Sequence, residues 1–196
     1  YIPGLPSGFS KEELICRINN TIEAMENINK IANFANRDFL TGAYNRRYFY
    51  QDIEEYVQAA EELDEPYAFA MLDIDHFKKI NDTYGHDGGD KILKSLAKIL
   101  TDNTKGRDVV ARFGGEEFCV VLKKIAKEEA IKFFVNLRAK VAENEIIIKD
   151  KIVRVTVSIG ISFGKGHCEI DDMLEACDSA LYVAKENGRN RVEIAL

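Results

Sequence analysis

The feature that most constrains the fold of this chain is an unbroken apolar run at residues 67–74, which reads Y-A-F-A-M-L-D-I. A strand with one face in water alternates apolar and polar residues, whereas this run stays apolar until Asp73. We therefore predict a strand that is buried on both faces, in a sheet covered by helices. No proline follows Pro66, so the remaining chain can form regular structure without the breaks that proline imposes.

Helical and strand patterns alternate along the chain. Apolar residues recur at steps of three and four where we predict helices, at residues 10–35, 46–62, from about 90, 127–144 and 171–187. Shorter apolar runs predict strands at residues 109–113, 118–122, 146–148, 153–163 and 192–194. Gly114 and Gly115 between two of these runs indicate a hairpin. The predicted fold class is α/β or α+β, with a central mixed sheet covered by helices.

The first predicted helix carries a narrow apolar stripe, which includes Leu14, Ile18 and Ile22, behind the capping-box pattern Ser10-x-x-Glu13. Such a stripe can pack on its own domain or pair with a second copy, and the sequence leaves both possibilities open. The break at residues 36–38 separates this helix, within residues 1–36, from a domain at residues 37–196. Because the chain begins with Tyr1, we expect it to be a fragment of a longer protein.

Composition excludes several functional classes. The 196 residues are 46% hydrophobic and 31% charged, which is typical of a soluble globular domain. The net charge of -6 argues against binding along a nucleic-acid polymer, which needs a basic surface. No apolar run approaches the ~20 residues of a membrane span, so we expect no membrane contact in this segment. Four cysteines without a C-x-x-C pair indicate reduced thiols and predict a cytoplasmic protein.

Two pairs of acidic residues lie at the ends of apolar strands. Asp73 and Asp75 end the run described above, and Glu116 and Glu117 follow the two glycines of the hairpin. A buried, unpaired carboxylate is costly, and a divalent cation would stabilise it. Taken alone, each pair is better explained as solvated loop or turn residues.

Other charged and glycine-rich segments favour a nucleoside triphosphate site. Carboxylates would hold Mg²⁺, the ion would bridge phosphate oxygens, and basic side chains would neutralise the remaining charge. The contributing segments are a glycine-rich loop (Gly85, Gly88, Gly89) before a helix at Asp90, and the cations Lys185 and Arg189 at a helix end.

The run Ala111-Arg112-Phe113-Gly114-Gly115-Glu116-Glu117-Phe118 resembles the signature of the GGDEF family of diguanylate cyclases, in its G-G-E-E-F form. Further segments resemble the family's other motifs in the same order, at residues 38–49, 72–90, 155–160 and 180–190. The resemblance is collinear from Asp38 to the C-terminus. It implies a catalytic domain at residues 37–196, with residues 1–36 as an N-terminal connector or dimerisation helix. It also implies a palm-like nucleotidyl cyclase architecture.

The resemblance also implies a reaction, in which two GTP molecules are joined into cyclic di-GMP with release of two pyrophosphates. The implied cofactor is Mg²⁺ or Mn²⁺, with two ions at each GTP site. Glu116 and Glu117 are the implied catalytic residues, and the implied metal ligands are Asp73, the carbonyl of Ile74, Glu116 and Glu117. The implied substrate-binding residues are Phe77, Lys78, Asn81, Asp90, Leu93, Gly114, Gly115, Lys185 and Arg189.

Partners follow from the same resemblance. Each domain supplies half of an active site, so a second copy of the chain must face the first. Residues 9–18 also resemble the start of the last helix of a response-regulator receiver domain, which implies an upstream sensory or receiver domain outside this segment. The alternative function is a catalytically silent GGDEF domain that acts as a receptor for GTP or cyclic di-GMP, or as a dimerisation module. Another palm-like nucleotide-polymerising enzyme would explain the carboxylates but not the pair Asn81 and Asp90.

The sequence departs from the family at one position. Many members bind their product at an Arg-x-x-Asp site upstream of the signature, where this chain reads Lys105-Gly106-Arg107-Asp108. Lysine keeps the charge but lacks the planar fork of arginine. We therefore expect weak or absent product inhibition.

Overall fold

The computed structural model describes residues 10–164 and 168–195. They fall into two compact units, the first ending at Asn36 and the second beginning at Arg37. Phe9, at the start of the receiver-like segment, lies outside the described residues. Among the helices of the described ranges, none combines the length and the hydropathy that crossing a lipid bilayer requires.

The first unit is the single helix α1 (Lys11–Asn36). It begins after Ser10, whose hydroxyl oxygen accepts a hydrogen bond from the backbone N–H of Glu13 at 3.1 Å, as the capping pattern predicted. The apolar stripe of this helix is about half exposed, since Ile18 is 49% and Ile22 48% exposed.

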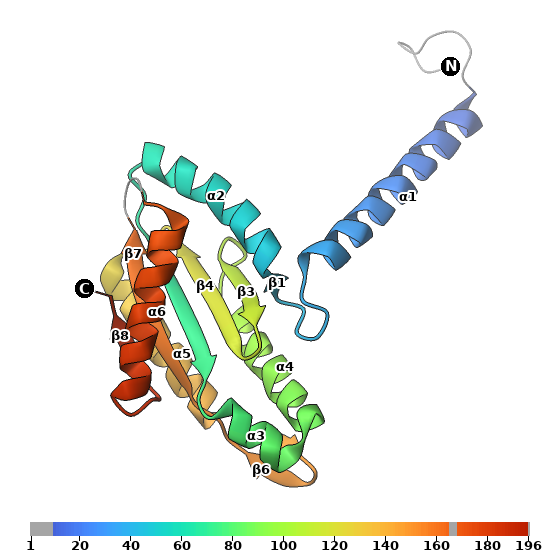
Figure 1. The fold of residues 1–196 in the computed structure, drawn as a ribbon. Coiled ribbons are helices and arrows are strands. Elements are labelled where there is room, and N and C mark those ends of the chain that lie inside the picture. Colours follow the sequence, from blue (N-terminus) through green and yellow to red (C-terminus); the bar gives the residue numbers. More distant parts are fainter. Residues whose placement is uncertain (1–9, 165–167, 196) are drawn as a thin grey trace. The chain divides into compact units, whose positions relative to one another are not determined.

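The second unit is built on a six-stranded sheet with the order β1-β3-β4-β2-β7-β8 (Figure 1). The central strand β2 is antiparallel to both β4 and β7, while β1 and β8 run parallel to their neighbours at the two edges. All eight residues of β2 are buried, as the apolar run predicted. The strands are β1 (Tyr44–Asn45), β2 (Tyr67–Ile74), β3 (Val109–Gly114), β4 (Glu117–Lys123), β7 (Val157–Gly164) and β8 (Val192–Ile194).

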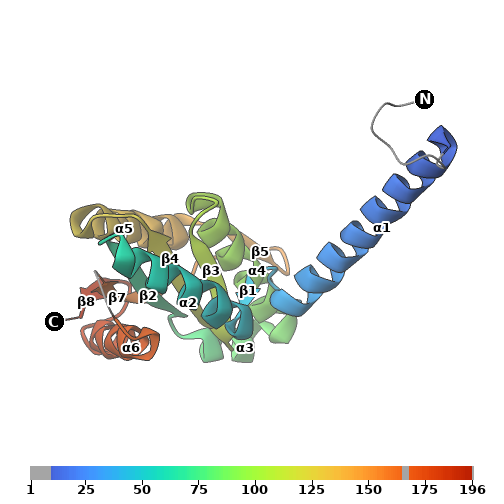
Figure 2. The same cartoon turned by 90° about the horizontal axis from the view of Figure 1, so that it is seen from above.

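Helices cover both faces of this sheet, which confirms the predicted fold class. Alternate residues of β2 pack on opposite faces, so Met71 joins the core with α2 and α6 while Leu72 joins the core with α4 and α5. Figure 2 shows α5 and α6 on opposite sides of the sheet. The four covering helices are α2 (Arg46–Glu62), α4 (His86–Asn103), α5 (Lys127–Glu143) and α6 (Ile170–Glu186).

The prediction of a glycine-rich loop directly before a helix at Asp90 was wrong. The chain instead forms helix α3 (Phe77–Tyr84), turns at Gly85 with φ 78°, and enters α4 at His86. Gly88 and Gly89 therefore lie inside α4. A Cβ atom on Gly88 would lie 2.6 Å from the Cβ of Tyr84, so these glycines let two helices pack closely instead of forming a loop.

The predicted strand at residues 153–163 is divided in the structure. Its first residue belongs to β6 (Lys151–Val153), which pairs with β5 (Ile146–Ile148) in a separate two-stranded hairpin. The main sheet resumes only at Val157, where β7 begins. The edge strand β1 was not predicted, because a strand of two residues leaves no periodic pattern.

Candidate active site

Asp73 is a buried carboxylate at the end of the central strand. It is 8% exposed and lies opposite Glu117 of β4 and Ser158 of β7 in the sheet register. Burial raises the pKa of Asp73, although Lys185 of α6 opposes the shift with its ammonium nitrogen 2.9 Å from Oδ2. The interpretation of Asp73 and Asp75 as solvated loop residues is therefore wrong, because both are buried.

The two acids of the hairpin are its last turn residue, Glu116, and the first residue of the following strand, Glu117. Gly115 has φ 39°, Glu116 is half-buried on the turn, and Glu117 begins β4. Burial raises the pKa of Glu117, and the negative charge of Asp73 raises it further. The charge of Asp73 on the neighbouring strand thus disfavours the charged form of Glu117.

The donors in this region suit a hard divalent cation such as Mg²⁺. Asp73 and Glu117 place carboxylate oxygens on adjacent strands, and a cation between them would offset the burial that raises both pKa values. Within residues 10–164 and 168–195, however, no three His, Cys, Asp or Glu side chains are gathered closely enough to form a metal cage. The carboxylate of Asp73 instead forms an ion pair with Lys185. The carbonyl of Ile74 belongs to a residue that is 1% exposed.

Asp75 has a different role from Asp73. Its carboxylate accepts hydrogen bonds from the hydroxyls of Thr156 and Ser158, both at 2.6 Å, and from the backbone N–H of Asn190 at 3.0 Å. These donors satisfy a buried charge without a metal ion. Asp75 therefore joins the end of β2 to β7 and to the chain after α6.

The basic residues reach the site because α6 packs very closely on β7. A Cβ atom on Gly160 would lie 2.1 Å from the carbonyl oxygen of Cys177 and 2.3 Å from the nitrogen of Leu181. Lys185 is one helical turn beyond Leu181 and meets Asp73. Arg189 follows the helix, and its positive charge lowers the pKa of Asp73, against the larger effect of burial.

The predicted guanine-reading residues come from the two helices after β2. A Cβ atom on Gly89 would lie 2.1 Å from the side-chain oxygen of Asn81, so Asn81 lies against the first turn of α4. Asp90 is the residue that follows Gly89 in this helix. Both side chains are half-buried. Of the remaining predicted substrate residues, Phe77 and Leu93 are buried, Lys78 is exposed, and Gly114 and Gly115 are exposed on the hairpin.

Arg112 is a residue whose role the sequence did not reveal. Its Nε and Nη2 donate hydrogen bonds to the carbonyl of Gly115 at 3.1 and 2.7 Å, and its Nη1 donates to Asp38 at 3.0 Å. Asp38 also accepts from the backbone N–H and the hydroxyl of Thr41. Burial alone would raise the pKa of Asp38, but the hydrogen bonds from Thr41 and Arg112 outweigh it and lower the pKa.

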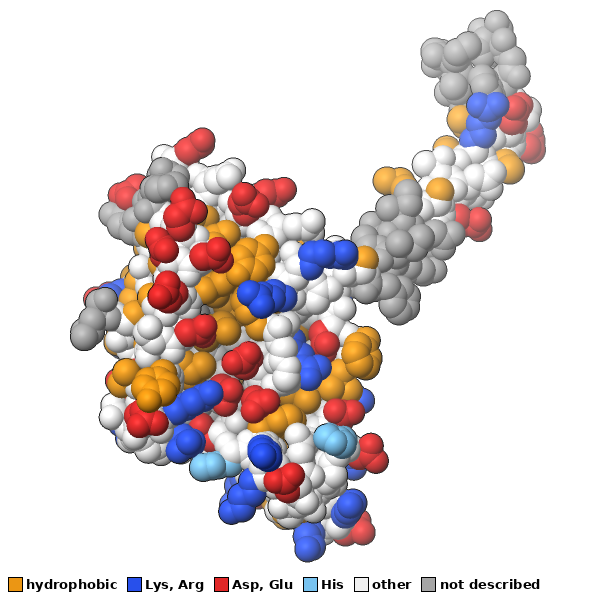
Figure 3. Space-filling view, viewed as in Figure 1, with side chains coloured by type: hydrophobic (Ala, Val, Ile, Leu, Met, Phe, Trp, Pro, Cys, Tyr) orange, Lys and Arg blue, Asp and Glu red, His pale blue; other side chains and the backbone are white. Residues whose placement is uncertain are grey.

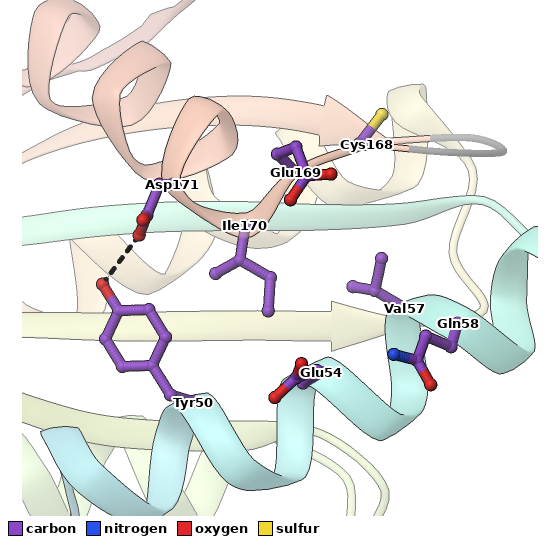
Figure 4. Close-up of a pocket in the computed structure, with 8 residues that line it drawn as sticks. All are labelled: Tyr50, Glu54, Val57, Gln58, Cys168, Glu169, Ile170 and Asp171. Atoms are coloured by element: carbon purple, nitrogen blue, oxygen red, sulfur yellow. Dashed lines mark hydrogen bonds between the residues drawn. The ribbon is translucent and has the colours of Figure 1, made fainter.

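The described part of the chain also has cavities on the side of the sheet that carries α2 and α6. One of about 410 Å³ lies between α2 and the start of α6, where the hydroxyl of Tyr50 donates to Asp171 at 3.1 Å (Figure 4). None of the predicted site residues lines it. Another, of about 310 Å³, is lined by Glu117 together with Arg46 and Asp178. Acidic side chains gather over α6 on this face (Figure 3).

Comparisons with known proteins agree on one family. A family model described as "Diguanylate cyclase, GGDEF domain" matches residues 35–191. Diguanylate cyclase DgcM of Escherichia coli strain K12 is 35% identical over 179 residues, which cover 91% of this chain and 43% of DgcM. Diguanylate cyclase A of Treponema denticola is 36% identical over 173 residues, which cover 86% of this chain and 47% of that protein. The chain thus spans less than half the length of these relatives.

A solved structure is similar over nearly the whole chain. The GGDEF domain of DgcB from Caulobacter crescentus in complex with c-di-GMP has a TM-score of 0.79 and 32% identity, and the match covers 82% of this chain and 93% of that one. The structure that includes the coiled coil has a TM-score of 0.84 and 28% identity, and the match covers 94% of this chain and 98% of that one.

Proposed function

The chain belongs to the GGDEF diguanylate cyclase family, and from that membership we propose that it condenses two GTP molecules into cyclic di-GMP and releases two pyrophosphates. The observation that carries the proposal is the register of Asp73 opposite Glu117, with the ammonium group of Lys185 2.9 Å from Asp73. Two acids at one end of neighbouring strands, with a cation beside them, suit the binding of a metal-bound triphosphate. DgcM and the Treponema denticola protein are both named diguanylate cyclases.

Asn81 and Asp90 are the proposed readers of the guanine base. A carboxylate can accept hydrogen bonds from the guanine N1–H and 2-amino group together, and adenine offers neither donor in that arrangement. A half-buried acceptor that loses its donors is costly, so the site would disfavour ATP. Leu93 is the proposed apolar contact beneath the base, supported by its burial in the first turns of α4.

Lys185 and Arg189 are the proposed partners of the β- and γ-phosphates. The proposed lining around the phosphates consists of the backbone of Phe77, Lys78, Gly114 and Gly115. In this proposal Lys185 exchanges its contact with Asp73 for a phosphate oxygen when GTP arrives. Asp73, the carbonyl of Ile74, Glu116 and Glu117 would hold Mg²⁺ or Mn²⁺. When bound, two such ions would supply positive charge that stabilises the reacting phosphate and the leaving pyrophosphate.

The proposed chemistry is an in-line displacement at the α-phosphorus. The 3′-oxygen of one GTP forms a bond to the α-phosphorus of the other, and the bond to the bridging oxygen of the pyrophosphate breaks. The carboxylate of Glu116 accepts the proton of the 3′-hydroxyl. A second, equivalent step closes the ring, so each cyclic di-GMP releases two pyrophosphates.

Two copies of the chain must face each other for this reaction, because each would bind one GTP. The half-exposed stripe of α1 supports pairing through that helix, since exposed apolar stripes mark contact surfaces. The related DgcB structure contains a coiled coil beside its GGDEF domain. We further propose that an upstream sensory or receiver domain controls this pairing, and that the protein works in the cytoplasm.

The decisive experiment incubates the protein with Mg²⁺ and GTP at high protein concentration and separates the products by chromatography. We expect cyclic di-GMP from the wild type and at least a hundredfold less from Glu116→Gln and Asp73→Asn, a loss typical of removing a catalytic acid or base. Circular dichroism would verify that both variants fold. Binding of GTP without any product would favour the alternative of a silent receptor domain, and equal product from the variants would refute the assigned roles.

A further inference from the structure

Gly188, Arg189 and Asn190, directly after α6, have consecutive left-handed φ angles of 107°, 64° and 46°. Glycine adopts such angles freely, but residues with a side chain seldom do. Two of them in succession persist only where the surrounding structure holds them in place. Arg189, a proposed phosphate ligand, is one of the two.

Asn190 is the point at which this turn is held. Its backbone N–H donates to Oδ2 of Asp75 at 3.0 Å. From the other direction, Nη1 of Arg138 donates to the carbonyl oxygen of Asn190 at 3.1 Å and to its side-chain oxygen at 2.7 Å. The backbone N–H, the carbonyl oxygen and the side-chain oxygen of Asn190 thus each have a charged partner.

The two partners come from separate parts of the fold. Asp75 follows the central strand and is fixed by the hydroxyls of Thr156 and Ser158. Arg138 comes from α5, which lies on the other side of the sheet from α6 (Figure 2). The turn is therefore connected to both layers of helices, although the proposed role of Arg189 concerns the active site alone.

We propose that Arg138 is a positioning residue for the triphosphate site, because it holds Asn190 and so fixes the turn that presents Arg189. The inference rests on the proposed function, in which Arg189 contacts the β- and γ-phosphates. A guanidinium suits this task because its planar, rigid group keeps both hydrogen bonds of Nη1 in one geometry. Arg138 is half-buried, which restricts the side chain further.

The first test measures amide hydrogen exchange by NMR in Arg138→Ala. The matched control is Lys140→Ala, since Lys140 is also a cation of α5 that donates a side-chain hydrogen bond to an asparagine, Asn103. We expect exchange at the amide of Asn190 to become about tenfold faster in Arg138→Ala and to stay unchanged in Lys140→Ala, because only the former opens the turn. Unchanged exchange in both variants would overturn the proposal.

The second test compares binding of the 3′-deoxy forms of GTP and GMP, which lack the attacking hydroxyl and cannot react. In Arg138→Ala we expect ~10-fold weaker binding of the triphosphate and unchanged binding of the monophosphate, because only the triphosphate reaches Arg189. In an Arg189→Ala background, Arg138→Ala should cause no further loss, since the two residues act through one contact.

The outcomes separate the two proposals. Equal loss for both nucleotides, or full additivity with Arg189→Ala, would mean general damage and would overturn the role of Arg138. Triphosphate binding by Arg138→Ala that equals wild type would overturn it too, while leaving the proposed function intact. A wild type that binds no guanine nucleotide would overturn both, and the exchange experiment would still decide whether Arg138 holds the turn.

Discussion

Arg112 and Asp38 form an ion pair at 3.0 Å across 74 positions of sequence, and both side chains are largely shielded, at 14% and 17% exposed. The same guanidinium donates two hydrogen bonds to the carbonyl of Gly115. The turn that carries Glu116 is thereby braced against the segment that begins the second unit. This pair is neither catalytic nor substrate-binding in the proposed function, but it fixes a backbone on which a catalytic residue sits.

We expect Arg112→Ala to lower both stability and turnover. Removing one partner of a shielded pair leaves Asp38 without its cation, at a cost of about 1–3 kcal/mol in the free energy of unfolding. Urea denaturation would measure this change. The matched control is Arg107→Ala, because Arg107 is 44% exposed and its nitrogen is 3.9 Å from Asp108. A similar loss in both variants would contradict a specific role for Arg112.

The pH dependence of that loss follows from the direction of the Asp38 shift. The folded-state pKa of Asp38 lies below its unfolded value, so the pair contributes stability above the unfolded pKa and loses it as pH falls through the folded one. The difference in stability between wild type and Arg112→Ala should therefore shrink on acidification from pH 7 to below pH 4. Denaturation curves across this range would check it, and a constant difference would argue against the ion pair.

Asp73 should behave in the opposite way. Burial raises its folded-state pKa above the unfolded value, so the charged form destabilises the nucleotide-free protein at neutral pH, and stability is regained as pH falls through the folded pKa. We expect Asp73→Asn to raise the Tm at pH 7 by a few degrees, since ~1 kcal/mol moves the Tm of such a domain by ~2–4 °C. The gain should diminish near pH 4. Lower Tm values in the variant at pH 7 would show that the contact with Lys185 outweighs burial.

The sequence predicted elements well where their patterns were long. The central strand was predicted at its observed bounds because its eight buried residues leave an apolar run in which Asp73 is the one polar residue. Helix α2 was likewise predicted at residues 46–62. The glycines of α4 misled the prediction, because a glycine needed for helix packing looks the same in sequence as a glycine needed for a turn. The brace between Arg112 and Asp38 could not be predicted, since no local pattern reports a contact across 74 positions.

The close packing of α6 on β7 predicts a severe effect of Gly160→Ala. The added Cβ would lie 2.1 Å from the carbonyl oxygen of Cys177, and backbone atoms cannot move aside as a flexible side chain can. We expect a loss of ~3 kcal/mol or more in the free energy of unfolding, and weaker GTP binding because Lys185 moves with α6. The control is Gly106→Ala, where a Cβ would meet no heavy atom within 4 Å. Wild-type stability in Gly160→Ala, measured by urea denaturation, would contradict the packing argument.

Asp90 offers a test of base selectivity that is separate from catalysis. If its carboxylate accepts hydrogen bonds from guanine, Asp90→Ala should weaken GTP binding and reduce the preference for GTP over ATP by about 10–100-fold. Competition binding with both nucleotides would measure the ratio. Asp87→Ala is the control, since Asp87 is an exposed acid in the first turn of the same helix. An unchanged ratio in Asp90→Ala would remove this residue from the proposed base site.

Product inhibition should be weak in the wild type and should strengthen in Lys105→Arg. Asp108 accepts backbone hydrogen bonds from Lys105 at 2.8 Å and from Lys123 at 3.1 Å, so the turn is already formed. What is missing is a planar guanidinium, which binds a guanine edge and a phosphate through paired hydrogen bonds. Initial rates at increasing cyclic di-GMP should therefore show an inhibition constant at least ~10-fold lower in Lys105→Arg. Tight inhibition of the wild type that disappears in Lys105→Ala would contradict this expectation, because lysine would then suffice.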